Sequence, residues 1–249
     1  MTDLSFLTRL PIAHRGLHNQ AKNIVENSGG AIRAAIKHGY AIEIDVQLTK
    51  DQKAIVFHDE TLDRVTGLNG KVIDYTLAEL QQIRYNAGDE TIISFGELLE
   101  LVDGQVPLII EVKSRFDNVG PLEAYIAKMM DGYDGDICIM SFNPLTVRKF
   151  RQIAPHIIRG IVAEYIMSPT DWRGINALGR FFIKNFVHWP LTRPNFISYH
   201  LHDLPSLSIT LARKLGIPVI SWTIKSPSDA EISAKYADQI TFEGFLPPK

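Results

Sequence analysis

Short apolar runs alternate with helical patterns along most of the chain. The runs, which predict buried strands, lie at residues 10–13, 41–48, 54–57, 106–113, 137–140, 157–162, 196–199, 217–222 and 239–242. Segments with apolar residues at helical spacing separate most of them. A repeated strand–helix order without a linker predicts a parallel sheet covered by helices. With about eight strands in 249 residues, we expect an α/β fold, a single (β/α)₈ TIM barrel spanning residues 1–249.

Capping residues mark where several of these helices begin. Ser28 precedes a helical pattern that stops at Gly39, and Asn143 stands directly before a proline. Thr76 and Ser94 each have a glutamate three residues later, which predicts two capping boxes. Residues 59–90 are otherwise rich in turns and glycine. We therefore expect a small insertion there, after the second barrel strand.

Charged and titratable residues stand at or near the ends of the early strands. Residues 41–48 alternate with period two, which places Glu43 and Asp45 on one face of a strand. The other early strands end at His14, His58 and Glu111. Active sites of (β/α)₈ barrels lie at the C-terminal ends of their strands. This placement predicts an active site built from these residues.

Three of these residues, Glu43, Asp45 and Glu111, are carboxylates that can converge at the barrel mouth. Uncompensated, they would repel one another, and a divalent cation would resolve this repulsion. A set of oxygen ligands suits Mg²⁺ or Ca²⁺ better than Zn²⁺. The alternative is that Glu43 and Asp45 face solvent on an edge strand, and from that pair alone it is the stronger interpretation. Glu111 favours the metal site because it ends an apolar run.

Two histidines complete a set suited to phosphodiester cleavage. His14 and His58 can accept and donate a proton near neutral pH. Arg15 and Lys113 can hold a phosphate group, Arg15 through its forked guanidinium. The alternative interpretation is that His14 is a structural histidine and Arg15 is a surface arginine. The other six histidines are not accompanied by such a set of charged residues, and we expect them to be structural or at the surface.

Composition excludes several classes of function. The net charge of −2 gives no reason to expect a nucleic-acid partner. The single cysteine, Cys138, excludes an intramolecular disulfide and fits a reducing compartment. The N-terminal residues lack the order of a signal peptide, and no apolar run is long enough for an integral membrane segment. We therefore expect a cytoplasmic protein.

Several motifs, in order and spacing, resemble the glycerophosphodiester phosphodiesterase family. They are His14-Arg15-Gly16, Glu26-Asn27-Ser28, the stretches 43–51 and 58–64, Glu111-Val112-Lys113, Ser141-Phe142 and the stretch 221–224. The resemblance covers nearly the whole chain and is densest between residues 14 and 64. It implies a TIM-barrel hydrolase with a small insertion after the second strand. Members of the family cleave glycerophosphodiesters, which are small molecules, to glycerol 3-phosphate and an alcohol with a divalent metal.

Carried over by position, the resemblance also implies roles for eight residues. Glu43, Asp45 and Glu111 would bind the metal, which would be Mg²⁺ or Ca²⁺, with Mn²⁺ possible. His14 would accept a proton and His58 would donate one. Arg15 and Lys113 match phosphate-contacting positions, and Trp222 matches an aromatic residue near the substrate. The chain departs from the family after the last strand, where Phe242 and Phe245 either shape the rim or, as we prefer, pack locally.

Two other functions and two oligomeric states stay open. The first alternative function is action on lysophospholipids, as a lysophospholipase-D-like or cyclising enzyme. The only aromatic cluster that suits a lipid surface consists of Trp172, Phe181, Phe182, Phe186 and Trp189. A catalytically inactive binding barrel is less favoured, because both histidines and all three carboxylates are present. The protein is expected to be a monomer or a homodimer.

Overall fold

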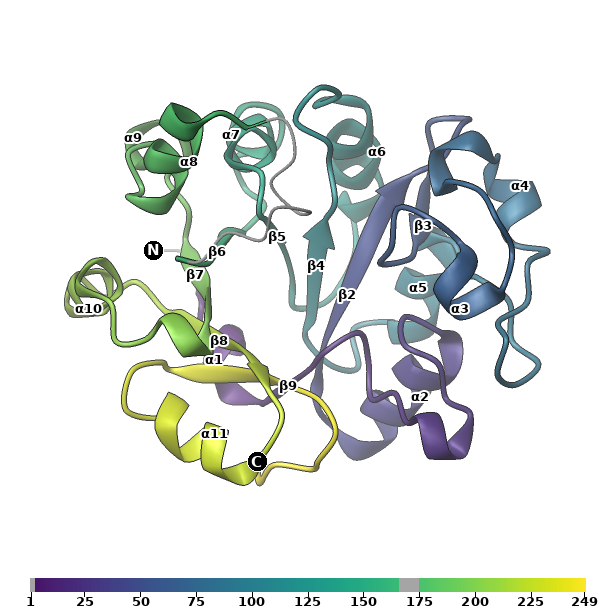
Figure 1. Cartoon of the computed structure of the whole chain (residues 1–249), viewed down its shortest axis with the longest axis horizontal. Coiled ribbons are helices and arrows are strands. Elements are labelled where there is room, and N and C mark those ends of the chain that lie inside the picture. The colour runs from purple at the N-terminus through teal and green to yellow at the C-terminus, as the bar shows by residue number, and fades with distance from the viewer. Residues whose placement is uncertain (1–2, 166–174) are drawn as a thin grey trace.

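Eight parallel strands close into a barrel in the computed structural model, which describes residues 3–165 and 175–249. β1 pairs with β9 on one side and with β2 on the other, which closes the ring (Figure 1). The TIM-barrel prediction is therefore confirmed. The strands are β1 (Ile12–Ala13), β2 (Ala41–Leu48), β4 (Leu108–Val112), β5 (Ile137–Ser141), β6 (Arg159–Ala163), β7 (Phe196–His200), β8 (Val219–Ile224) and β9 (Gln239–Phe242).

Helices surround this barrel, and their beginnings follow the predicted caps. Ser28 accepts a hydrogen bond from the backbone N–H of Ala31, and both predicted capping boxes are present. The helices outside the insertion are α1 (Phe6–Arg9), α2 (Gly29–His38), α5 (Phe95–Val102), α6 (Pro121–Met130), α7 (Pro144–Ile153), α8 (Ala177–Lys184), α9 (Trp189–Thr192), α10 (Leu207–Lys214) and α11 (Pro227–Ser233). None of the helices in the described ranges has the length and apolarity needed to cross a membrane.

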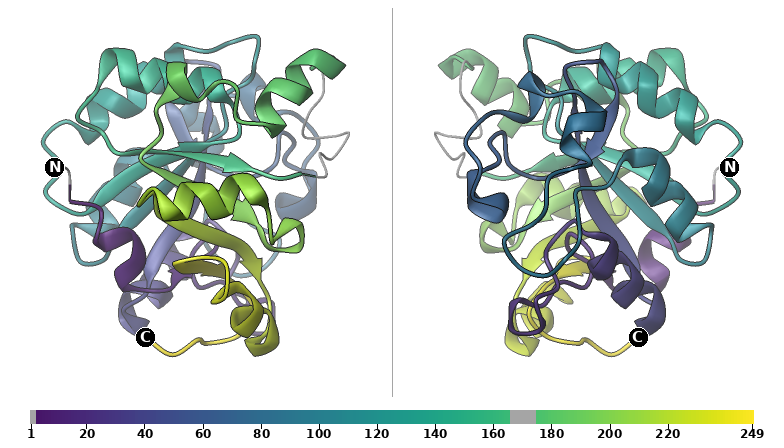
Figure 2. Two further views of the ribbon diagram at one scale, coloured as in Figure 1. Left: turned by 90° about the vertical axis from the view of Figure 1, so that its left-hand side faces the viewer. Right: turned by 90° about the vertical axis from the view of Figure 1, so that its right-hand side faces the viewer.

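The residues predicted to form an insertion, 59–90, follow a strand that is not one of the eight barrel strands. β3 (Ala54–Val56) pairs antiparallel with β2 and forms a hairpin on the barrel wall. The short helices α3 (Asp63–Thr66) and α4 (Leu77–Leu80) follow it. They enclose a small apolar core of their own. Figure 2 shows this insertion on one side of the barrel, with α8, α9 and α10 on the opposite side.

Alternation along the strands separates an inner core from an outer one. On β2, Ala41 faces an inner cluster, whereas Ile42 and Ile44 pack against the surrounding helices. The N-terminal end of the barrel is filled by α1 and the ring of Phe196. That ring lies against Gly160, where a Cβ atom would collide with it. The apolar filling at this end leaves the polar residues of the strands at the opposite, C-terminal end.

The aromatic cluster proposed for a lipid surface is divided in the structure. Phe181 and Phe182 on α8 are exposed. Phe186 and Trp189 instead contact each other and pack against a core cluster that contains Tyr199. Trp172 lies outside the described residues. The four described aromatic residues therefore do not form the single lipid-facing surface that was predicted from the sequence.

A buried histidine at the start of α9 makes stability sensitive to pH. His188 is 8% exposed, and burial lowers its pKa from 6.5 to about 4. As the pH falls below 6.5, the unfolded chain therefore binds a proton that the folded chain does not bind until about pH 4. We expect the free energy of unfolding to decrease by on the order of 3 kcal/mol through this interval. Urea unfolding at a series of pH values measures it.

A matched pair of variants isolates this contribution. His188→Gln should flatten the pH dependence between pH 6.5 and 4, whereas substitution of the exposed His156 by glutamine should leave it unchanged. Equal slopes in His188→Gln and the unmodified protein would contradict the assignment.

Candidate active site

Three carboxylates converge inside the C-terminal end of the barrel. Glu43 and Asp45 lie on β2, two and four residues after the inward-facing Ala41. Glu111 on β4 pairs in register with Asp45. One oxygen atom of each carboxylate lies within 4.8 Å of the others. The edge-strand interpretation is wrong, because β2 lies between β1 and β4 in a closed barrel and both of its carboxylates are buried.

The carboxylates strongly perturb one another's ionisation. Burial, together with the negative charges of Asp45 and Glu111, raises the pKa of Glu43 well above its usual value. Its Oε1 atom is buried and has no hydrogen-bond partner among the described residues. For Asp45, the positive charges of Lys113, His58 and Arg15 outweigh burial and hold the pKa well below its ordinary value. Without a cation, therefore, the carboxylates favour a state in which Glu43 is protonated and Asp45 is ionised.

The loop after β1 brings a cation and a backbone donor to this cluster. Arg15 donates its backbone N–H to Glu43 Oε2 at 3.0 Å, and its Nε lies 3.4 Å from Asp45 Oδ2. Gly16 follows with a φ of +76°, and a Cβ atom there would lie 2.9 Å from Ala31 of α2. Only glycine fits both the left-handed backbone and this close approach. The Arg-Gly pair therefore determines how closely the loop packs between β2 and α2.

Asn27 holds Asp45 from the same loop region. Its amide donates to Asp45 Oδ2 at 2.9 Å, and its carbonyl oxygen accepts the backbone N–H of Asp45 at 3.2 Å. The neighbouring Glu26 pairs with Arg15 at 2.7 Å and with Arg64 of α3 at 2.6 Å. These contacts link the insertion to the loop after β1 and fix the orientation of the Asp45 carboxylate.

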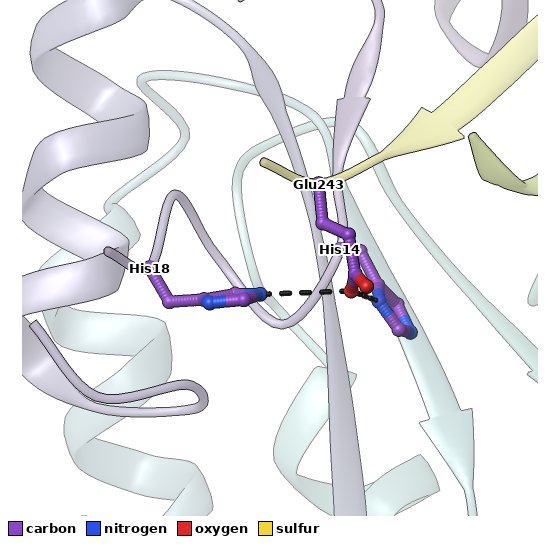
Figure 3. Close-up of side chains that lie close together, drawn as sticks. All are labelled: His14, His18 and Glu243. Atoms are coloured by element: carbon purple, nitrogen blue, oxygen red, sulfur yellow. Dashed lines mark hydrogen bonds and ion pairs between the residues drawn. The ribbon is translucent and has the colours of Figure 1, made fainter. Parts of the chain in front are cut away.

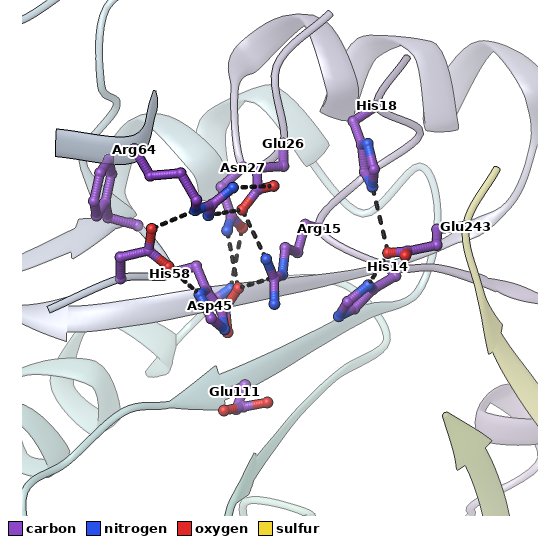
Figure 4. Close-up of polar contacts among 12 residues, drawn as sticks. His14, Arg15, His18, Glu26, Asn27, Asp45, His58, Arg64, Glu111 and Glu243 are labelled. Carbon is purple, nitrogen blue, oxygen red and sulfur yellow. Dashed lines mark hydrogen bonds and ion pairs between the residues drawn. The ribbon is translucent and has the colours of Figure 1, made fainter. Parts of the chain in front are cut away.

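Lys113, just beyond the end of β4, also contacts the carboxylates. Its Nζ lies 2.9 Å from Glu111 Oε1 and 3.3 Å from Asp45 Oδ1. The two carboxylates raise the pKa of Lys113 although burial acts in the opposite direction. Lys113 and Arg15, both predicted to contact phosphate, therefore stand as positive charges beside the acidic cluster. Figure 4 shows Arg15 with Asp45 and Glu111.

His58 lies directly after β3 and is held by its sequence neighbour. Its Nδ1 is 2.6 Å from Asp59 Oδ1. The other Asp59 oxygen accepts a hydrogen bond from Arg64 at 2.5 Å, and this pairing with both side chains holds the pKa of Asp59 low. An ionised carboxylate can only accept, so Nδ1 of His58 carries the hydrogen. Nε2 is then the nitrogen left for proton transfer.

His14, at the end of β1, is held in the same manner by a residue that follows β9. Its Nδ1 is 2.6 Å from Glu243 Oε2 (Figure 3). Its Nε2 is 3.9 Å from Glu43 Oε2. His18 Nε2 lies 3.7 Å from the same Glu243 oxygen, and Lys225 Nζ lies 2.9 Å from Oε1. The hydrogen bond from His14, together with the nearby His18 and Lys225, holds the pKa of Glu243 well below its usual range. Glu243 is therefore ionised, and Nδ1 of His14 is the donor.

Aromatic side chains lie at the end of β8. Trp222 contacts Phe142 edge to face, with ring centroids 5.5 Å apart, and His200, with centroids 4.9 Å apart. Its indole N–H is buried and has no hydrogen-bond partner among the described residues. Phe242 is buried against Tyr40 and Phe245, which agrees with our preference for local packing at the end of β9.

The sequence predictions can now be placed in three dimensions. Arg15 contacts Glu43 and Asp45, and Lys113 contacts Asp45 and Glu111. His14 Nε2 lies 3.9 Å from Glu43, whereas His58 pairs with Asp59. Partners without a predicted role are Glu26, Asn27, Asp59 and Glu243. His18, which we expected to be structural or at the surface, lies 3.7 Å from Glu243. Asn27 stands within a quoted motif, Glu26-Asn27-Ser28, which was a usable signal. Glu243 directly follows the predicted strand 239–242, so its place at a strand end was a signal, but its pairing with His14, 229 positions away, was not predictable from the local pattern.

Comparisons with known proteins agree with this geometry. The model of the glycerophosphoryl diester phosphodiesterase family matches residues 14–244. A glycerophosphodiester phosphodiesterase of Caldanaerobacter subterraneus subsp. tengcongensis is 30% identical over 235 residues, covering 89% of this chain and 88% of that protein. A phosphodiesterase structure from Oleispira antarctica, in complex with the product sn-glycerol-3-phosphate, has a TM-score of 0.78 at 23% identity and covers 95% of this chain and 94% of its own. A Thermotoga maritima glycerophosphodiester phosphodiesterase has a TM-score of 0.71 at 22% identity, with 94% of each chain covered. The chain therefore belongs to the glycerophosphoryl diester phosphodiesterase family.

Proposed function

We propose that this enzyme hydrolyses glycerophosphodiesters to glycerol 3-phosphate and an alcohol, with a divalent cation on Glu43, Asp45 and Glu111 and proton transfer by His14 and His58. One observation carries the proposal. Each histidine has its Nδ1 held by a carboxylate, and His14 directs its Nε2 toward the buried acidic cluster. Family membership supports the reaction class.

The acidic cluster fits a divalent cation. It offers oxygen donors from two neighbouring strands, and Glu43 Oε1 is buried without a partner among the described residues. A donor set of oxygen atoms alone suits Mg²⁺, Ca²⁺ or Mn²⁺. When bound, the cation would neutralise charge on the phosphate oxygens and favour attack at phosphorus. The positive charge of the bound cation would also favour the ionised form of Glu43.

His14 is suited to accept a proton. Burial lowers the pKa of His14, which keeps Nε2 free to act as a base. In the proposed reaction, Nε2 takes the proton of the glycerol 2-hydroxyl as its oxygen attacks phosphorus. His58 gives a proton to the leaving alkoxide. Water then opens the resulting cyclic phosphate, with the two histidines in reversed roles.

Arg15, Lys113 and Trp222 complete the proposed substrate site. Arg15 is held at the acidic cluster by Asp45, with its Nε 3.4 Å from Oδ2, and contributes a positive charge that favours a bound phosphate. Lys113 adds a second positive charge, and the Trp222 ring offers an apolar face with an unsatisfied N–H.

We place all of these groups in a single cytoplasmic domain, 1–249, acting as a monomer or homodimer. Light scattering after gel filtration tests the oligomeric state.

Removal of metal tests the proposal. Glycerol 3-phosphate release from glycerophosphocholine should fall to background in EDTA, because the acidic cluster alone repels a phosphodiester. Addition of Mg²⁺, Ca²⁺ or Mn²⁺ in excess of EDTA should restore turnover and identify the cofactor. Full turnover in EDTA, after metal analysis shows a metal-free protein, would contradict the proposed metal dependence.

A second candidate, action on lysophospholipids, is supported by exposed apolar side chains on α8. Leu178, Phe181 and Phe182 are 65%, 56% and 45% exposed, and such side chains can contact a lipid surface. Turnover of lysophosphatidylcholine that exceeds turnover of glycerophosphocholine, and that needs micelles or vesicles, would favour this candidate. Turnover confined to the soluble diester would exclude it.

A further inference from the structure

A second group of metal-ligating side chains lies beside the acidic cluster. We call His14, His18 and Glu243 the histidine–glutamate cluster. One ligand atom of each lies within 4.8 Å of the others. The two imidazole rings approach the same carboxylate from different sides (Figure 3). All three side chains are partly accessible, with exposures of 17% for His14, 24% for His18 and 20% for Glu243. His18 Nε2, which lies 3.7 Å from Glu243, is buried and has no hydrogen-bond partner among the described residues, so this nitrogen is available to a metal.

The donors of this cluster differ in kind from those of the acidic cluster. Two neutral imidazole nitrogens and one carboxylate oxygen form a set typical of Zn²⁺ sites that retain an open position. Mg²⁺ and Ca²⁺ prefer oxygen ligands, so they should favour the acidic cluster instead. We propose that the histidine–glutamate cluster is a second metal site, selective for borderline cations such as Zn²⁺ and Co²⁺, and that its occupation inhibits the enzyme.

The inhibition follows from the position of one proton on His14. In the metal-free cluster, Nδ1 carries the hydrogen and donates it to Glu243, which leaves Nε2 as the base. A metal at Nδ1 needs the lone pair of that nitrogen, so the hydrogen must move to Nε2. The imidazole stays neutral, and no proton is released. His14 then has no lone pair with which to accept the proton of the substrate hydroxyl.

The surrounding charges set limits on this site. Lys225 Nζ lies 2.9 Å from Glu243 Oε1, so Oε2 is the oxygen available to a metal. The positive charge of Lys225 opposes cation binding and makes the site weaker than one with a free carboxylate. Binding of the metal depends only on the geometry of the three side chains. The inhibition, in contrast, rests on the proposed role of His14.

Substitution of His18 separates the two metal sites, because His18 has no part in the proposed chemistry. We compare the unmodified protein with His18→Gln and, as a control, His156→Gln, which alters an exposed histidine in the turn after α7. Each protein is saturated with Mg²⁺ and titrated with Co²⁺, followed by visible absorption, and with Zn²⁺, followed by glycerol 3-phosphate release. Inhibition in each protein is expressed relative to its own turnover in Mg²⁺ alone.

The expected result is specific to His18. The unmodified protein and His156→Gln should show cobalt absorption bands and inhibition by Zn²⁺ that additional Mg²⁺ does not relieve. In His18→Gln the bands should be lost, and the Zn²⁺ concentration for half-inhibition should rise at least about tenfold. Equal cobalt spectra with and without His18 would overturn the site. Cobalt bands that depend on His18, without inhibition by Zn²⁺, would overturn the inhibition and contradict the role of His14.

Discussion

His14→Asn should lower kcat for glycerophosphodiester hydrolysis by roughly 10²- to 10⁴-fold, the range typical of a lost general base. Asparagine can place an N–H near the position of Nδ1 and keep the hydrogen bond to Glu243, which lies at 2.6 Å in the native protein. It offers no basic nitrogen at the position of Nε2. The loss should therefore appear in kcat, with little change in KM or in the melting temperature. Steady-state kinetics with saturating metal and thermal unfolding measure these quantities.

The exposed histidine variant His156→Gln serves as the matched control and should retain full activity. If His14→Asn retained more than about a tenth of the native kcat, His14 would not be the base, because general-base contributions below tenfold fall outside the expected range. A loss accompanied by unfolding would be resolved by His14→Gln, which tests the same nitrogen with a longer side chain.

Glu111→Gln should weaken binding of the divalent cation by at least about tenfold and abolish turnover, because it removes one charged ligand of three. The fold should survive. Glutamine has nearly the same shape, and its oxygen can still accept the hydrogen bond that Lys113 donates to Glu111 at 2.9 Å. Without metal, the variant should unfold at the same or a higher temperature, because Glu111 is one of the charges that raise the pKa of Glu43. Calorimetric titration with Mg²⁺ and with Ca²⁺ measures the affinity.

A glutamate elsewhere on the surface provides the comparison for Glu111→Gln. Glu100 on α5 is exposed, and Glu100→Gln should leave metal affinity and turnover unchanged. Native metal affinity in Glu111→Gln would contradict the assignment of this residue as a ligand.

Local patterns predicted those features of the site that depend on a single strand. Alternation along residues 41–48 placed Glu43 and Asp45 on one face, and the buried strand is indeed inward-facing at both positions. Helix caps could be predicted equally well, because the capping hydrogen bonds of Ser28, Thr76 and Ser94 span only three residues. These features are set by short-range sterics and hydrogen bonds, so a short stretch of sequence contains them.

Features that depend on closure of the barrel could not be predicted in this way. Glu243 meets His14 only because β9 pairs with β1 across the whole length of the chain. The position of Glu243 directly after β9 indicates the C-terminal end of the barrel, but it does not identify His14 as the partner. The antiparallel pairing of β3 was also hidden, because a short apolar run has the same pattern in either direction.

Phosphorus NMR of glycerophosphocholine turnover tests the central claim most directly, because it identifies the bond that is cleaved. The account predicts that metal-loaded protein converts the diester signal into glycerol 3-phosphate, with a cyclic glycerophosphate as a transient species, and that neither forms with His14→Asn. Formation of phosphocholine and glycerol, or no turnover with any of Mg²⁺, Ca²⁺ and Mn²⁺, would contradict it.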